Sequence, residues 1–194
     1  WGNLITCKTF NDIWLNEGFA RYCQALWVEN IDGKQAYFNF MNDHAYYGGG
    51  TIYVENPSSN SQIFNSSLSY NKASWVLHML RHKVGDEMFF EILKEYASND
   101  SLAYNAASTA DFQKVCEDIS GTDFEQFFQQ WIYGDRYPKY ELSWWIEEND
   151  IYKVKIDQIQ SYGIFSMPID LKFSGAAGPL SIDTTIVVQN SSAS

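Results

Sequence analysis

The hydrophobic periodicity of this 194-residue chain changes once along its length, and this change constrains the fold more than any other feature. Between residues 10 and 133 the apolar side chains recur every three or four positions, which is the spacing of helices that bury one face. Between residues 138 and 190 they alternate with polar side chains, as in strands. Tyr137-Pro138 separates the two regimes, because proline disfavours helix in the residue before it. The sequence therefore predicts an α+β chain with a helical domain at 1–137 and a β domain at 138–194.

Helices are predicted throughout the first domain, at roughly 11–29, 34–45, 68–84, 86–96, 108–121 and 123–131. Gly85 is expected to end the third of these, Asp86 to cap the fourth and Ser108 to begin the fifth. The first helix carries apolar residues on nearly every side, which is typical of a buried helix. The segment 46–66 is rich in Gly, Ser and Asn and predicts a long loop, a kind of segment that tends to be functional or mobile.

The second domain is predicted to hold strands at 140–147, 151–159, 167–173 and 181–188. The first two are separated by Glu148-Asn149-Asp150, which indicates a β-hairpin, and the last two by the turn residues 175–179. Four strands make a small antiparallel sheet or a partial β-sandwich. Residues 190–194 are expected to be a frayed tail.

Composition excludes some classes of partner. Aromatic residues make up 17% of the chain, which favours a folded protein with a substantial core. The formal net charge of -11 disfavours binding to nucleic acid and to anionic membranes. No apolar run approaches the roughly 20 residues of a membrane-spanning helix.

The cysteines and the ends of the chain say less. Cys7, Cys23 and Cys116 have no CxxC spacing, so neither a disulfide framework nor a cysteine zinc site is indicated, although one pair could bridge. The chain opens at Trp1-Gly2 without Met, so the lack of a signal peptide does not bear on its location. The Asn, Ser, Tyr and Trp content of the strand region favours, by analogy alone, a secreted or periplasmic bacterial protein.

Glu17 is the most unusual residue of the first helix, because its neighbours on the helix include Ile13, Trp14 and Ala20. A carboxylate that loses its hydration in such surroundings needs a compensating partner. One possible partner is Arg21, four residues later, and the local pattern taken alone favours this ion pair. The other is a metal ion.

Two segments near the start of the chain, Trp1–Leu4 and Trp14–Ala20, resemble the M1 family of zinc aminopeptidases. In that family His-Glu-x-x-His-x-Trp-Trp-Gly-Asn is followed by a helix with Asn-Glu-Gly-Phe-Ala, and eighteen residues separate the second His from the Glu. If Trp1 is the second Trp of this motif, the last histidine would precede it by three residues, and the spacing to Glu17 matches. The resemblance implies that the His-Glu-x-x-His segment lies outside this chain.

Two later segments are also similar to the family. Leu68–Ala73 resembles the Tyr-x-Lys-Gly helix, with Ala73 in place of the usual Gly. Phe127–Trp131 followed by Tyr137-Pro138 resembles the exit from the catalytic domain. The resemblance therefore implies the helical C-terminal half of a thermolysin-like, gluzincin catalytic domain, followed by an antiparallel β-sheet or partial β-sandwich.

The resemblance also implies roles for two residues. Glu17 would be the third zinc ligand, beside two upstream histidines, and Tyr70 would donate a hydrogen bond to the oxyanion formed from a peptide substrate. For Tyr70 the alternative is a buried ring whose hydroxyl binds a backbone group. Since the two histidines, the general base and the loop that grips the substrate's amino group have no match here, the chain alone is expected neither to bind zinc tightly nor to hydrolyse peptides. The competing functional hypothesis is a non-catalytic peptide-binding or scaffold module related to the same family.

Three further expectations concern histidines and exposed surface. His78 and His82 lie four residues apart on one helix face, as metal ligands often do, but they lack an obvious third ligand. His44 is expected to cap a helix end or to be solvated. Because an upstream helix would pack against the first helix, Ile13, Trp14 and Trp27 are expected to be exposed and to promote self-association.

Overall fold

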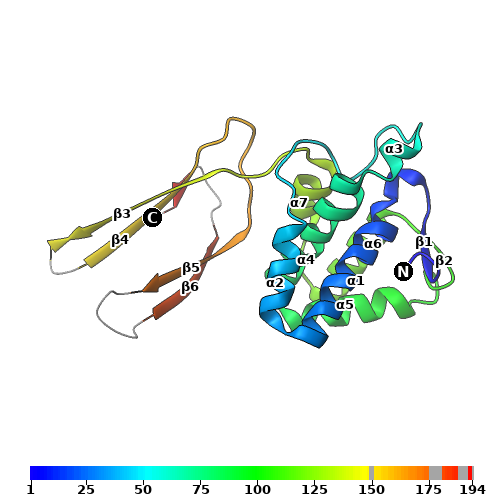
Figure 1. Cartoon of the computed structure of the whole chain (residues 1–194), viewed down its shortest axis with the longest axis horizontal. Coiled ribbons are helices and arrows are strands. Elements are labelled where there is room, and N and C mark those ends of the chain that lie inside the picture. The colour runs from blue at the N-terminus through cyan, green and yellow to red at the C-terminus, as the bar shows by residue number, and fades with distance from the viewer. Residues whose placement is uncertain (149–150, 175–180, 188–191, 194) are drawn as a thin grey trace. The chain divides into compact units, whose positions relative to one another are not determined.

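The computed structural model describes residues 1–148, 151–174, 181–187 and 192–193. The chain forms two compact units, Trp1–Arg136 and Tyr137–Ser194, so the division falls one residue before the predicted domain boundary. The first unit is mainly helical and the second consists of strands (Figure 1). The α+β fold class predicted from the change of period is confirmed.

The first unit is built mainly from helices, and its first α-helix is the longest. Its α-helices are α1 (Trp14–Asp32), α2 (Lys34–Asp43), α3 (Asn60–Ile63), α4 (Ala73–Val84), α5 (Asp86–Ser98), α6 (Thr109–Ser120) and α7 (Glu125–Phe128). A 3-10 turn, η1 (Phe10–Asp12), precedes α1, and two π-helical segments, η2 (Ser66–Lys72) and η3 (Gln129–Tyr133), adjoin α4 and α7. Strands β1 (Ile5–Cys7) and β2 (Asn105–Ala107) form a short parallel pair.

The structure tests the three predicted helix ends, at Ser108, Gly85 and Asp86. Ser108 caps α6 in a capping box, in which its hydroxyl accepts from the backbone N–H of Asp111 and the Asp111 carboxylate accepts from the backbone N–H of Ser108. Gly85 lies between α4 and α5 with a φ of 83°, a left-handed value that favours glycine. Asp86 does not cap α5 as predicted, because its carboxylate is hydrogen-bonded to the Arg81 guanidinium instead.

The core of the first unit is an aromatic cluster around α1. Phe19 is 1% exposed, and its ring packs against those of Tyr96 and Phe112. The prediction that Ile13 and Trp14 are exposed was wrong, since they are 3% and 0% exposed. The Trp14 ring packs against Phe112, and its indole N–H donates to the Thr109 hydroxyl at 2.9 Å, so α6 covers this side of α1.

The second unit is built from antiparallel strand pairs. β3 (Tyr140–Glu147) pairs along its whole length with β4 (Ile151–Gln158), and β5 (Pro168–Ser174) pairs with β6 (Ser181–Val187). The described core residues include Ile156, Phe165 and Met167. The predicted tail needs correction, because β7 (Ser192–Ala193) pairs with β4. Most of the predicted turn at 148–150, the turn at 175–179, Val188 and the tail positions 190, 191 and 194 lie outside the described residues.

Candidate active site

Glu17 lies in the first turn of α1, and the residues on either side of it fix the local geometry. Asn16 joins α1 to β1, because its Oδ1 accepts from the Cys7 backbone N–H at 2.8 Å. Gly18 faces α4, and a Cβ atom placed on it would lie 2.6 Å from the Cβ of Ala73. Only glycine therefore lets α1 approach the start of α4 this closely. This contact sets the spacing between Glu17 and the segment that precedes Ala73.

Tyr70 belongs to that segment, the π-helical η2. The Asn65 side chain caps η2 by accepting from the backbone N–H groups of Ser67 and Leu68 at 3.0 and 3.1 Å. The buried Ser69 hydroxyl donates to the Ile63 carbonyl at 2.8 Å and fixes the other side of the turn. π-Helical segments are rare, and they are frequent at functional sites. The sequence predicted an ordinary helix here, because a hydrophobic period does not distinguish the two.

The hydroxyl of Tyr70 lies near the carboxylate of Glu17. Burial raises the pKa of Tyr70, and the charge of Glu17 and its hydrogen-bonding contact with the hydroxyl raise it further, while Arg21 acts in the opposite direction. The hydroxyl therefore keeps its proton at neutral pH and remains a hydrogen-bond donor.

Arg21 does not form the ion pair with Glu17 that the local pattern favoured. Its Nη1 donates to Gln24 Oε1 at 3.0 Å and contacts His44 Nε2 at 3.3 Å. Among the ion pairs of the described residues there is none between Arg21 and Glu17. His44 follows the last residue of α2, near a helix end as expected, and its ring stacks on Phe40.

Lys72 is a further buried residue of the site that the sequence did not single out. Its side chain is 7% exposed, and its ammonium group donates to the carbonyl oxygens of Gly50 and Gly134 at 2.7 and 3.2 Å. Burial lowers the pKa of Lys72 to about 8, and the charge of Asp135 opposes this effect. The predicted 46–66 loop is interrupted by α3, and its last residue belongs to η2. Lys72 therefore ties η2 both to the irregular segment before α3 and to the chain leaving η3. The only sequence signal was its place two residues after Tyr70.

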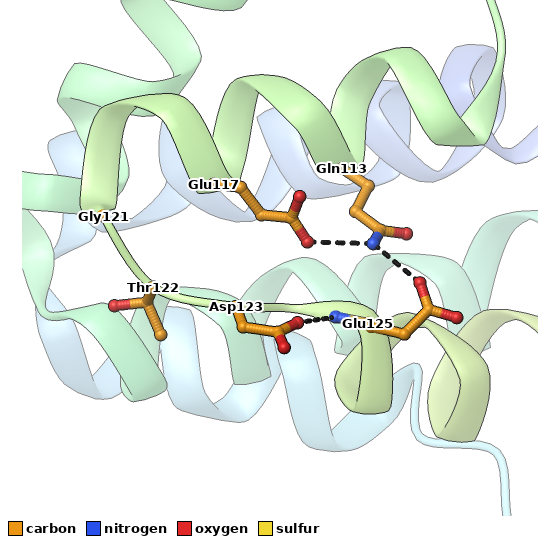
Figure 2. A pocket seen from close by; sticks show the side chains of 6 residues that line it. All are labelled: Gln113, Glu117, Gly121, Thr122, Asp123 and Glu125. Carbon is orange, nitrogen blue, oxygen red and sulfur yellow. Dashed lines mark hydrogen bonds between the residues drawn. The ribbon is translucent and has the colours of Figure 1, made fainter.

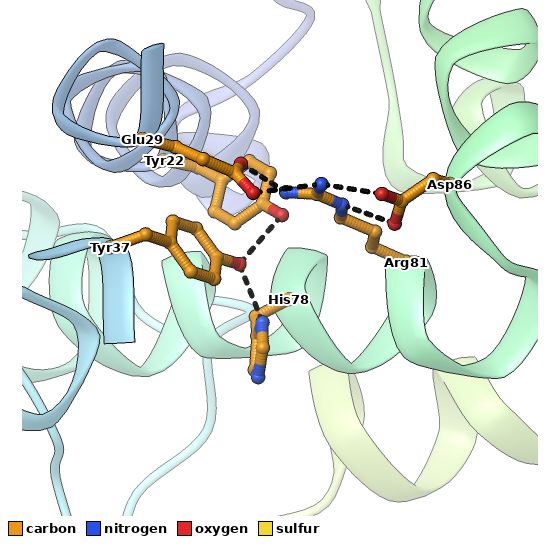
Figure 3. A network of polar contacts seen from close by, with 6 residues as sticks. All are labelled: Tyr22, Glu29, Tyr37, His78, Arg81 and Asp86. Carbon is orange, nitrogen blue, oxygen red and sulfur yellow. Dashed lines mark hydrogen bonds and ion pairs between the residues drawn. The ribbon is translucent and has the colours of Figure 1, made fainter. Parts of the chain in front are cut away.

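The two histidines of α4 do not form a metal site. Within the described part of the chain, no three His, Cys, Asp or Glu side chains lie close enough together to hold a metal ion. His78 Nδ1 is 2.6 Å from the Tyr37 hydroxyl, and burial lowers the pKa of His78 to about 4. Figure 3 shows that this contact continues through Tyr37 to Tyr22, whose hydroxyls are 3.0 Å apart. His78 thus belongs to a structural network between α1, α2 and α4.

Beside this network, Arg81 joins three helices. It is 8% exposed and forms ion pairs with Glu29 of α1 and Asp86 of α5, at 2.6 and 2.8 Å (Figure 3). Both contacts are bidentate, which uses the planar guanidinium fully. Arg81 is the buried member of both pairs, so removing its carboxylate partners would leave its charge uncompensated, and this cluster fixes the helices that carry the site.

A surface depression beside α6 is separate from Glu17 and Tyr70 (Figure 2). Gln113 donates to Glu117 and Glu125 at 2.9 and 3.1 Å, and Glu117 also accepts from the Phe124 backbone. The Asp123 carboxylate accepts from the Glu125 backbone N–H at 2.7 Å. These acidic groups therefore organise the turn from α6 to α7, and the depression does not contribute to the site.

Comparison with known proteins identifies the family. The sequence model of the peptidase family M1 domain matches residues 1–131, which include both Glu17 and Tyr70. The chain belongs to peptidase family M1. No helix in the described residues is long and apolar enough to span a membrane.

Relatives in the M1 family are much longer than this chain. Aminopeptidase N from Lactococcus lactis subsp. lactis is 31% identical over 150 residues, which are 71% of this chain and 17% of that protein. Tricorn protease-interacting factor F2 from Thermoplasma volcanium is 27% identical over an alignment of 200 positions that covers 94% of this chain and 24% of that protein. The chain therefore spans at most about a quarter of these two relatives.

Solved structures of M1 proteins show the same fold. The M1 zinc metallopeptidase of Deinococcus radiodurans is 26% identical, with a TM-score of 0.59 over 70% of this chain and 30% of its own. Legionella pneumophila aminopeptidase A has a TM-score of 0.78 over 97% of this chain and 22% of its own. At 15% identity the second likeness shows the fold alone, and it extends into the strand unit.

Proposed function

We propose that the full-length protein is a zinc-dependent aminopeptidase, in which Glu17 is the third zinc ligand and Tyr70 stabilises the oxyanion. The observation that carries this proposal is the close approach of α1 to the start of α4 at Gly18 and Ala73, which brings Glu17 and Tyr70, from different elements, near each other. M1 family membership supports it, because the relatives include aminopeptidases and zinc metallopeptidases.

The residues present fit one part of a zinc site. Glu17 is a half-buried carboxylate that is not engaged by Arg21, so its oxygens can serve as ligands. Because catalytic zinc sites typically use three protein ligands, two more must come from outside this chain. Bound zinc would polarise the scissile carbonyl and lower the pKa of a water molecule to about 7.

This chain's own contribution to catalysis would be positioning and hydrogen bonding. Tyr70 keeps its proton, so its hydroxyl can donate to the oxygen of the scissile carbonyl as negative charge develops there. The Gly18–Ala73 contact and the cap at Asn65 hold η2, which carries Tyr70, beside the first turn of α1, which carries Glu17. Since the donor is already oriented, little reorganisation is needed during the reaction.

The test is substitution of Tyr70 in the full-length protein. Tyr70→Phe should lower kcat for peptide hydrolysis by about 10²–10³-fold, as loss of one oxyanion donor does, with zinc content unchanged. Tyr104→Phe is the matched control, since Tyr104 is 90% exposed. Wild-type kcat in Tyr70→Phe would contradict the proposal. It would favour the competing hypothesis of a non-catalytic peptide-binding or scaffold module.

We also propose that the isolated chain self-associates through α1. Trp27 and Ile31, one turn apart, are 67% and 58% exposed, and exposed apolar surface promotes association. Sedimentation velocity of the isolated chain should show concentration-dependent oligomers that Trp27→Gln weakens. Gln24→Ala on the same helix is the control. A monomer at every concentration would refute this proposal.

A further inference from the structure

Arg21 is a half-buried cation, and neither of its hydrogen-bond partners is a carboxylate. One partner is the Gln24 amide oxygen and the other is His44 Nε2, and Nη1 contacts both. His44 Nδ1 lies 2.7 Å from the Phe40 carbonyl oxygen, which can only accept. Nδ1 therefore carries a proton, and in the neutral imidazole Nε2 accepts from Arg21. These contacts orient the guanidinium and leave its charge uncompensated.

The opposite edge of the guanidinium has no partner. Nε is buried and makes no hydrogen bond, and within the described part of the chain Nη2 makes none either. Nε and Nη2 together form an edge that can bind both oxygens of one carboxylate. A buried donor without an acceptor is destabilising, so such a group in a folded protein calls for an explanation. A carboxylate ligand would satisfy both donors and the charge.

The position of Arg21 indicates which part of a substrate its Nε–Nη2 edge would face. This inference rests on the proposed function. Arg21 follows Glu17 by four residues, which is about 6 Å along the helix axis and on the same face. The charge of Arg21 also acts on the Tyr70 hydroxyl, where it favours a lower pKa. In the proposed mechanism this hydroxyl lies beside the scissile carbonyl. The free amino group of an aminopeptidase substrate is cationic and would be repelled by Arg21. The guanidinium therefore suits the part of the peptide beyond the scissile bond.

We propose that Arg21 is a specificity-determining residue that binds a substrate carboxylate on the C-terminal side of the scissile bond. An extended peptide advances about 3.3–3.6 Å per residue, so a distance of one helical turn corresponds to the first or second residue after that bond. Two sources supply the same chemistry. One is an acidic side chain in a longer peptide, and the other is the terminal carboxylate of a dipeptide or tripeptide.

The test uses the full-length protein and matched peptides. Leu-Glu-Gly-amide against Leu-Gln-Gly-amide reports the side-chain source, and Leu-Gly against Leu-Gly-amide reports the terminal source. In Arg21→Gln the ratio of kcat/KM for the charged to the neutral member of a pair should fall about tenfold or more, as expected for loss of a charge-assisted bond. Arg21→Lys keeps the charge without the bidentate edge and should recover part of the ratio. Lys94→Gln, an exposed change of equal charge on α5, should leave both ratios unchanged.

The outcomes separate this inference from the proposed function. A lowered ratio in either pair supports the carboxylate subsite and identifies its source. Ratios equal to those of the wild type in both pairs would overturn it, even if Arg21→Gln lowers all rates uniformly. If no peptide is cleaved, the aminopeptidase proposal fails. Calorimetric titration with the same peptides then still decides the inference, because charged peptides must bind wild-type protein more tightly than neutral ones and lose that advantage in Arg21→Gln.

Discussion

Replacing Gly18 with alanine tests whether the close contact between α1 and α4 sets the geometry of the site. The added Cβ would lie 2.6 Å from the Cβ of Ala73. Since carbon atoms pack at about 3.5–4.0 Å, the two segments must separate by about 1 Å. Overpacking of this kind costs about 1–3 kcal/mol in stability. A displacement of about 1 Å between catalytic groups can cost about 10²-fold in rate, so kcat should fall tenfold to a hundredfold.

A compensating substitution makes this prediction specific. In Gly18→Ala/Ala73→Gly the Cβ of residue 73 is gone, and the new Cβ at residue 18 would lie 3.4 and 3.5 Å from the carbonyl carbon and Cα of residue 73, which relieves the clash. The double variant should therefore recover most of the kcat lost in Gly18→Ala. Ala73→Gly alone controls for helix propensity, which costs about 1 kcal/mol. Steady-state kinetics and Tm on full-length protein are the assays. Wild-type kcat and Tm in Gly18→Ala, or no recovery in the double variant, would refute the reasoning.

Two further predictions concern buried titratable groups. His78 has a pKa of about 4 in the folded protein against an ordinary value of 6.5, so the unfolded chain takes up its proton first as the pH falls. The free energy of unfolding should therefore decline by up to about 3 kcal/mol between pH 6.5 and 4. His78→Gln should reduce this decline. An equal loss of unfolding free energy over this pH range in both proteins would contradict the lowered pKa of His78. Ile52 and Tyr53 lie just after Gly50, which Lys72 binds, and their N–H groups donate to the Ile132 carbonyl. Lys72→Met should therefore speed amide hydrogen exchange at Ile52 and Tyr53 by about tenfold. Unchanged exchange there would show that Lys72 does not secure this part of the chain.

Periodicity predicted the helical and strand regimes because it reports which residues of one segment are buried. It could not predict which distant segment covers them. Ile13 and Trp14 were expected to be exposed for lack of an upstream helix, but residues of α6, more than ninety positions later, cover Trp14. Arg21 has an acidic neighbour four residues away, yet it contacts His44, which only the packing of α2 brings near.

The candidate site shows the same division between local and distant information. Glu17 and Tyr70 could be singled out because their motifs resemble those of a known family. The π-helical geometry of η2 was not predictable, since the same hydrophobic pattern suits an α-helix. Asp86 was misassigned as a helix cap because a strong local preference was outweighed by a bidentate contact with Arg81.

The most direct test of the central claim is the zinc affinity of full-length protein carrying Glu17→Gln. Loss of residues that only support zinc ligands typically weakens metal binding by 10–100-fold, so loss of a ligand should weaken it by more than about a hundredfold. Asp32→Asn, at the exposed end of the same helix, is the control. Competition with a chelator, followed by metal analysis, should show zinc retained by the wild type and the control and lost from Glu17→Gln. Equal zinc affinity in all three proteins would contradict the account.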